Sequence, residues 1–198
     1  MKRRTICLAV LAAVALFVVP GVAGAKKGAK HGNSATHSFV LMADAPNIGT
    51  AANGDHVEVT CESRAHACGT FQVHPKALPN PPTGEFVHKD ANGGVIAEGT
   101  WTATRLISFH FYGCRFIPAV GADLGDDNLC GGAVKMRVEL AVSGDGTVPG
   151  ILTVFCIVGP KAPASHNTPP GEGVTLVVPG VANFNHTGGG ENIYVRQG

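Results

Sequence analysis

The sequence is poor in charged residues, and the charges that it carries are scattered. Asp, Glu, Lys and Arg make up 15% of the 198 residues, and the formal net charge is +1. Lys26, Lys27 and Lys30 form a basic cluster, but it precedes the strand-rich part of the chain. Nucleic-acid binding depends on a concentrated basic surface that neutralises phosphates. We therefore expect no nucleic-acid partner.

The familiar catalytic and cofactor signatures are missing as well. The sequence holds no G-x-S-x-G, no P-loop, no H-E-x-x-H and no nucleotide-binding fingerprint. Its nine histidines include no His-x-His pair, and the acidic stretch 123–128 lacks the spacing and the closing Glu of an EF-hand. We expect no cofactor and no metal, and a binding or structural role is favoured over an enzymatic one.

One apolar run has the features of a targeting segment. It covers residues 6–19, follows the basic start MKRR and precedes the small residues Ala23-Gly24-Ala25. This pattern predicts a signal peptide over residues 1–25. The run is shorter than the roughly 20 apolar residues that span a bilayer, and no later segment is as apolar. The mature protein is therefore expected to be secreted, periplasmic or part of the cell envelope, with no integral membrane segment.

The rest of the chain is expected to form one β-domain. Residues 26–37, KKGAKHGNSATH, are polar, basic and small, which predicts a disordered lead-in. Residues 38–198 are long enough to bury a core of their own. The 27 Gly and 13 Pro of the chain, together with its low charge, favour strands and turns over helices in this domain.

Short runs with the period of β-strands recur along the domain. In VKMRVELAV, residues 134–142, apolar residues alternate with Lys135, Arg137 and Glu139, which is typical of a strand with one buried face. Turn sequences such as DANGG and SGDG separate neighbouring runs. The runs that we expect as strands are 39–42, 57–61, 69–74, 85–89, 95–99, 101–112, 133–142, 151–158, 174–178 and 192–196.

Neighbouring runs have the character of hairpin partners throughout the domain. This predicts an all-β fold, a single antiparallel β-barrel of about 8–10 strands, with a β-sandwich as the alternative. Three segments do not fit as strands: 77–83 is expected as a proline-bound turn, and 115–132 and 159–173 as long loops.

Five cysteines remain after residue 25, and export permits disulfides. Cys61 and Cys68 flank one loop, and Cys114 and Cys130 flank another, so these two pairs are favoured among the many possible. Strand alternation places Cys61 and Cys68 on opposite faces, and a bulge or an irregular loop end is needed to bring them together. Cys156 lies within the apolar LTVFCIV and is expected to be a buried small side chain.

The stretch VIAEGTWTATRLISFHFYGC, residues 95–114, holds the candidate ligand-binding residues. Alternation predicts a core face that carries Trp101 and Phe109, but it places Arg105 on that face and Leu106 on the polar one. A bulge near Arg105 accounts for this exchange, because an extra residue resets the alternation. Alternatively, Arg105 points inward and pairs with a buried acid or a ligand carboxylate. The candidates are Trp101, Arg105, Phe109, His110 and Tyr112.

Two resemblances bear on the fold. Gly99-Thr100-Trp101 resembles the G-x-W that opens the barrel of lipocalins and other calycins, although there it lies near the mature N-terminus and here in mid-chain. The segments 84–113, 132–146 and 151–159 are similar to a group of uncharacterised secreted bacterial proteins. That resemblance implies export and an all-β domain, and it transfers no activity and no functional residue.

Three functions remain open at this point. The leading hypothesis is a non-enzymatic exported barrel that binds a small apolar or amphipathic ligand, or a partner surface, at the open end near the long loops. The second is a structural cell-envelope or extracellular assembly component that uses its odd cysteine or its exposed edges. The third is a cyclase- or isomerase-like barrel enzyme, which needs a charged residue inside the cavity, and Arg105 is the residue available for it.

Overall fold

Strands make up most of what the structure describes, as the composition predicts. The computed structural model describes residues 37–61, 66–117, 128–166 and 171–197, all of which belong to the unit Ser34–Gly198. The predicted signal peptide, 1–25, and the lead-in up to residue 36 lie outside the described residues. So do most of the acidic stretch 123–128 and parts of the two predicted long loops.

The described residues form thirteen strands and one short 3-10 helix, η1 (Ala164–His166). The strands are β1 (Ser38–Ala43), β2 (Asn47–Thr50), β3 (His56–Cys61), β4 (Ala67–Gln72), β5 (Ala77–Asn80), β6 (Thr83–Lys89), β7 (Val95–Cys114), β8 (Leu129–Val142), β9 (Gly146–Cys156), β10 (Gly173–Val178), β11 (Ala182–Phe184), β12 (His186–Gly189) and β13 (Asn192–Gln197).

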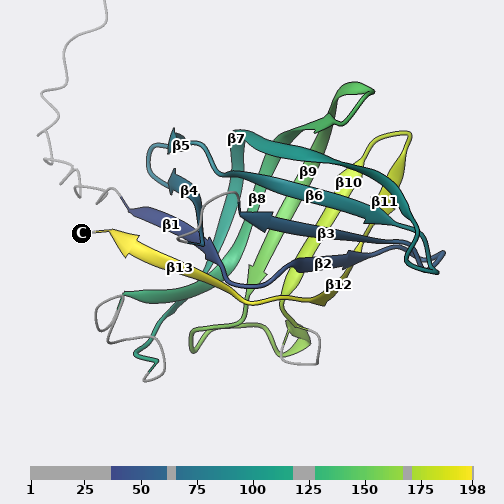
Figure 1. Cartoon of the computed structure of the whole chain (residues 1–198). Coiled ribbons are helices and arrows are strands. Elements are labelled where there is room, and N and C mark those ends of the chain that lie inside the picture. Colours follow the sequence, from purple (N-terminus) through teal and green to yellow (C-terminus); the bar gives the residue numbers. More distant parts are fainter. Residues whose placement is uncertain (1–36, 62–65, 118–127, 167–170, 198) are drawn as a thin grey trace, which may run out of the picture. The chain divides into compact units, whose positions relative to one another are not determined.

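All thirteen strands belong to one antiparallel sheet that curls into a half-barrel (Figure 1). The main path runs β12-β2-β3-β6-β7-β8-β13-β1-β4-β5, and β9, β10 and β11 continue from β8 as a branch. The all-β, antiparallel prediction is confirmed. The prediction of a closed barrel of about 8–10 strands is wrong, because the sheet has thirteen strands and the barrel is open. The two-sheet sandwich is also wrong.

The 20-residue strand β7 connects the parts of this sheet. Its residues Val95–Thr102 pair with Thr83–Lys89 of β6 on one side. On the other side, its residues from Gly99 to Cys114 pair with β8. Along the β8 ladder the register shifts three times, and the first shift lies between Ala103 and Arg105. Arg105 is exposed and Leu106 is buried. The predicted bulge is confirmed, and the alternative of an inward Arg105 is excluded.

Several elements differ from the expected ones. The runs 95–99 and 101–112 merge into β7, and residues 77–80, expected within a turn, form β5 by pairing with β4. The strands β2, β11 and β12 were not expected at all. These strands have three or four residues each and contain Gly, Asn or His, so they lack an alternation long enough to detect. Pairing with longer neighbours orders them.

Both favoured cysteine pairs are at disulfide-bonding distance: Cys61 with Cys68, and Cys114 with Cys130. The irregularity needed for the first pair is present in β4. Leu41 pairs with Gly69 and Met42 with Ala67, so Cys68 is an extra residue between two ladder positions. The bulge turns the Cys68 side chain toward Cys61, as the alternation of the two strands required.

Trp101 is the largest side chain of the core, and only 2% of its surface is exposed. Its indole N–H donates to the Thr60 carbonyl over 3.0 Å, across the intervening strand β6. Gly84 pairs with Trp101 at this crossing, and a Cβ on Gly84 would overlap the Thr60 carbonyl and crowd the indole nitrogen. The tryptophan and the glycine therefore fit together as one packing unit between β3, β6 and β7.

We expect Trp101→Phe to lower the free energy of unfolding by about 1–3 kcal/mol, because the Thr60 carbonyl loses its indole partner and the smaller ring leaves a gap. Urea unfolding followed by circular dichroism measures this change. Phe116→Leu, at an aromatic residue that is 48% exposed, is the control and should change stability little. Equal effects of the two substitutions would contradict the core role of Trp101.

Candidate functional site

The five predicted ligand-binding residues all lie in β7, but they do not converge on one site. Trp101 belongs to the core, and Tyr112 is also buried, which raises the pKa of its hydroxyl. Arg105 and His110 are exposed. Phe109 is half-buried and, of these five residues, it alone lines a hollow with other aromatic side chains.

Five aromatic rings from four strands form what we call the aromatic cluster. Phe109 lies at its centre, with ring centroids 4.9 Å from Phe39, 4.9 Å from Phe71 and 5.1 Å from Tyr194. Phe111 joins at 5.8 Å from Phe39. Two of the contacts of Phe109, with Phe71 and Tyr194, are edge-to-face, the arrangement that aromatic quadrupoles favour.

Strand register explains why these rings meet. In the ladders of β1, Phe39 is opposite Phe71 of β4 on one side and opposite Arg196 of β13 on the other. Directly opposite residues of an antiparallel pair project from the same face with their side chains in contact. A row of neighbouring side chains therefore crosses β4, β1 and β13 and consists of Phe71, Phe39 and Arg196. Phe109 and Phe111 of β7 lie against this row.

The outer part of the cluster opens into a hollow of about 240 Å³, which we call the aromatic hollow. Phe111 is 44% exposed there, an unusual exposure for so large an apolar side chain. The polar side chains at this hollow can carry positive charge, and no Asp or Glu is found among its described lining residues. The hollow is lined by Phe39, Phe109 and Phe111, with His37, His74 and Arg196 as the polar members.

A second hollow, of about 510 Å³, lies where the chain leaves β7 and β9 toward the predicted long loops. Its apolar lining includes Met42, Ile117 and Val158, and Glu172 is half-buried beside them. The two carboxylate oxygens of Glu172 accept the N–H groups of Ile157 at 2.9 Å and Asn192 at 3.4 Å. The carboxylate thus bridges the chain after β9 to the start of β13, which is a structural role.

Burial raises the pKa of Glu172, and the two backbone N–H donors oppose that shift without cancelling it. The nearby Cys156 is fully buried, and its thiol donates to the Cys130 carbonyl over 3.6 Å. Burial, and next the negative charge of Glu172, raise the pKa of Cys156 well above the usual range of a thiol. A thiol held protonated in this way is a poor nucleophile, in agreement with its expected structural role.

Among the described residues, the hollow lined by core side chains of the half-barrel is small. The hollow between Val57, Phe86, Leu140 and Leu176 has a volume of only about 60 Å³. Pockets for drug-sized ligands are about 300–1,000 Å³. Even benzene takes a cavity of about 150 Å³, so the peripheral hollows and not this one are large enough for a small ligand.

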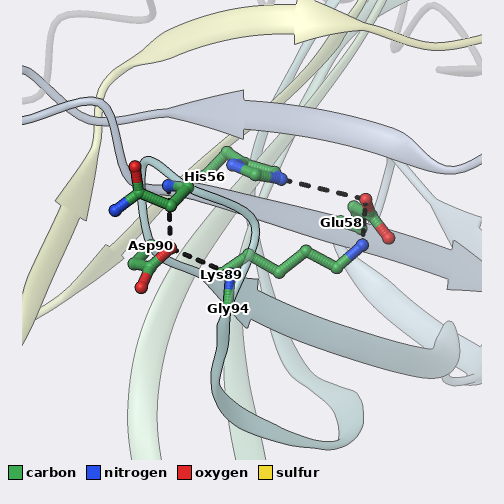
Figure 2. Close-up of polar contacts among 6 residues, drawn as sticks. His56, Glu58, Lys89, Asp90 and Gly94 are labelled. Carbon is green, nitrogen blue, oxygen red and sulfur yellow. Dashed lines mark hydrogen bonds and ion pairs between the residues drawn. The ribbon is translucent and has the colours of Figure 1, made fainter.

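A polar network at the β6–β7 hairpin is also structural (Figure 2). Lys89 Nζ lies 2.6 Å from Glu58 Oε1, and His56 Nε2 lies 3.9 Å from the same oxygen. The Asp90 carboxylate accepts the N–H groups of Asn92 and Gly94 at 2.8 and 2.9 Å, and these bonds lower its pKa. The network joins β3 to β6 and closes the turn after β6.

Neither a metal centre nor a spanning helix emerges from the parts of the chain that are described. No group of three or more His, Cys, Asp or Glu side chains converges there in a way that would hold a metal ion. No helix within the same residues is long and apolar enough to cross a membrane.

Comparison with protein-family models, curated proteins and solved structures found no match for this chain.

Sequence reasoning included Phe109 but missed the residues that surround it. Phe39, Phe71, Tyr194 and Arg196 come from strands far apart in the chain, and only the pairing of β1 with both β4 and β13 brings them together. The one available signal was the spacing of Tyr194 and Arg196, which places both on one face of the last strand.

We expect Cys156 of the folded mature chain to resist alkylation by iodoacetamide, because the thiol is buried and protonated. The same thiol should react readily once the chain is unfolded. Mass spectrometry with the disulfides intact measures the modification. The control is Val181→Cys at a position that is 73% exposed, where the new thiol should react in the folded state. Rapid native modification of Cys156 itself would contradict its burial.

Because the folded pKa of Glu172 is raised, its contribution to stability is present below its unfolded pKa, near 4.5, and is lost as the pH rises through the folded pKa. We therefore expect Glu172→Gln to become more favourable, relative to wild type, as the pH rises from about 4.5 through the raised folded pKa. Urea unfolding across this range measures the difference. Glu98→Gln, at an exposed strand position, is the control for the substitution itself. A flat difference for Glu172→Gln would contradict the assignment.

Proposed function

We propose that the protein is an exported, non-enzymatic β-protein that binds a small amphipathic ligand in the aromatic hollow. The observation that carries the proposal is the half-exposed Phe111 beside Phe39 and Phe109, in a hollow whose polar members are His37, His74 and Arg196. Ligand sites commonly combine an apolar lining with a few polar groups that fix orientation. Export is supported by the N-terminal apolar run, and the two disulfides are compatible with an oxidising compartment.

The charge of the hollow favours a ligand with an anionic head. Arg196 is permanently cationic, and its partner across the β1–β13 ladder is Phe39, so an apolar wall and a guanidinium are direct neighbours. A carboxylate or sulfonate can pair with the guanidinium while the apolar body of the ligand contacts the rings. The two exposed histidines add positive charge when they are protonated.

The size of the hollow favours a small ligand. Its volume of about 240 Å³ is below that of drug-sized pockets. A cavity of about 150 Å³ accommodates benzene. One aromatic ring or a short alkyl chain with an acidic head therefore fits better than a long lipid.

The two alternative functions have less support. The assembly hypothesis relied on an odd cysteine or on exposed edges, and Cys156 is fully buried. The cyclase- or isomerase-like hypothesis needed a charge inside the barrel, and Arg105 is exposed on the outside. A partner surface in place of a small ligand stays compatible with the aromatic hollow.

The proposal is tested with octanoate and phenylacetate as anionic probes and octanol as a neutral probe, by titration followed by NMR. Trp101 does not line the hollow, so its fluorescence is not the readout. We expect Phe111→Ala to weaken binding of all three probes about tenfold, because a ring of the wall is lost. Arg196→Gln should weaken the binding of the two anions but not of octanol.

Val181→Ala, at an exposed apolar residue outside the hollow, is the matched control and should leave binding unchanged. If none of the probes binds, or if Phe111→Ala and Val181→Ala have the same effect, the aromatic hollow is not the ligand site.

A further inference from the structure

Two arginines are directly opposite each other in the ladder between β7 and β8. Arg105 of β7 pairs with Arg137 of β8, and both side chains are exposed. In an antiparallel pair, opposite side chains have Cβ atoms about 5 Å apart and lie on the same face of the sheet. Like charges in this position oppose the pairing of the strands. The pair therefore departs from what strand stability alone would favour.

The bulge in β7 creates this arrangement. Trp101 and Ala103 are buried, so an uninterrupted strand would turn Arg105 toward the core. Thr104 is the extra residue, and its hydroxyl donates to the Arg137 carbonyl over 3.4 Å. Bulges frequently re-aim a side chain at a functional position. Here the bulge directs a guanidinium outward, toward a second guanidinium.

Two lysines extend the positive charge, and with the arginines they form what we call the cationic patch. Lys135 is exposed on the same face of β8 as Arg137, two residues away. Lys76 donates to the Ile107 carbonyl of β7 and lines a groove of about 650 Å³ together with Arg105. The remaining lining of this groove includes Leu78, Pro81 and Thr104.

No acidic side chain of the described residues forms an ion pair with the cationic patch. Among the ion pairs formed by the described residues, none involves Arg105, Arg137 or Lys135. Glu139 lies on the same face of β8, two residues from Arg137, but it is opposite Thr102 and forms no ion pair with either arginine. The positive charge of the patch is therefore available to an external anion.

We propose that the cationic patch binds a phosphate or sulfate group, held between the guanidinium groups of Arg105 and Arg137. A guanidinium presents a planar fork of N–H donors that matches two oxygens of such a group. A doubly charged tetrahedral anion has enough oxygens for both forks and neutralises both charges. Lys135 and Lys76 add longer-range attraction. This site is independent of the aromatic hollow, and either one can fail without affecting the other.

The test is titration of the mature protein with inorganic phosphate and sulfate, against sodium chloride of matched ionic strength. Isothermal calorimetry measures binding and thermal unfolding measures linked stabilisation. We expect phosphate or sulfate to raise the melting temperature of the wild type more than chloride does, because a ligand of the folded state stabilises it. If chloride raised the melting temperature as much, the stabilisation would be due to charge screening alone, and the proposal would be overturned.

Variants separate a built site from general positive charge. Arg105→Gln and Arg137→Gln should each weaken anion binding about tenfold, and Arg105→Lys should weaken it although the net charge is kept. Arg115→Gln removes an exposed arginine outside the β7–β8 ladder and is the matched control. Binding that is weakened equally by Arg115→Gln, or left intact in Arg105→Lys, would contradict recognition by the paired guanidinium groups.

The stability of Arg105→Gln separates a role in anion binding from a role in stabilising the fold. In chloride alone, Arg105→Gln should be at least as stable as the wild type, because repulsion across the ladder is removed. A marked loss of stability in chloride would mean that Arg105 serves the fold and not an anion.

A final experiment distinguishes a lipid headgroup from a free anion as the ligand of the cationic patch. Vesicles of phosphatidylcholine containing phosphatidic acid are compared with vesicles of phosphatidylcholine alone in a sedimentation assay. Binding to the first kind only, lost in Arg105→Gln together with phosphate binding, assigns the site to a lipid headgroup. Binding of inorganic phosphate without vesicle binding assigns it to a free anion. Vesicle binding that survives in Arg105→Gln would contradict a role of the cationic patch in membrane contact.

Discussion

The rest of the structure depends on the ladder between β7 and β8. It runs from Gly99 to Cys114, the disulfide Cys114–Cys130 closes one end of it, and its outer edges carry β6 on one side and β9 and β13 on the other. The twist of the sheet makes the ends of two strands of this length diverge. The sheet continues from the ladder in two branches and forms an open half-barrel.

The three register shifts in this ladder decide what each part of β7 contributes. Trp101 fills the core before the first shift. Arg105 reaches solvent immediately after it, and Phe109 meets the aromatic cluster further along. One strand thus supplies core, charged surface and aromatic wall in turn. Bulges allow this because each extra residue reassigns the side chains that follow to the opposite face.

Local features of the chain could be predicted from the sequence, and partners across the sheet could not. The alternation in residues 134–142, the exchange of Arg105 and Leu106, and the misfit of Cys68 each followed from a few neighbouring residues. The neighbours of Phe39 depend on which strands pair, a choice made by burial over the whole domain. Both proposed sites consist of such cross-strand neighbours, so the sequence singled out one member of each, Phe109 and Arg105, and not the partners on the other strands.

The short strand β5 has a consequence for the behaviour of the protein in concentrated solution. It ends the main path of the sheet, where exposed backbone groups can template the strand of another molecule. Pro79 within β5, and Pro81 and Pro82 directly after it, have no backbone N–H to offer to an incoming chain. This border therefore resists edge-to-edge aggregation, although the sheet is left open.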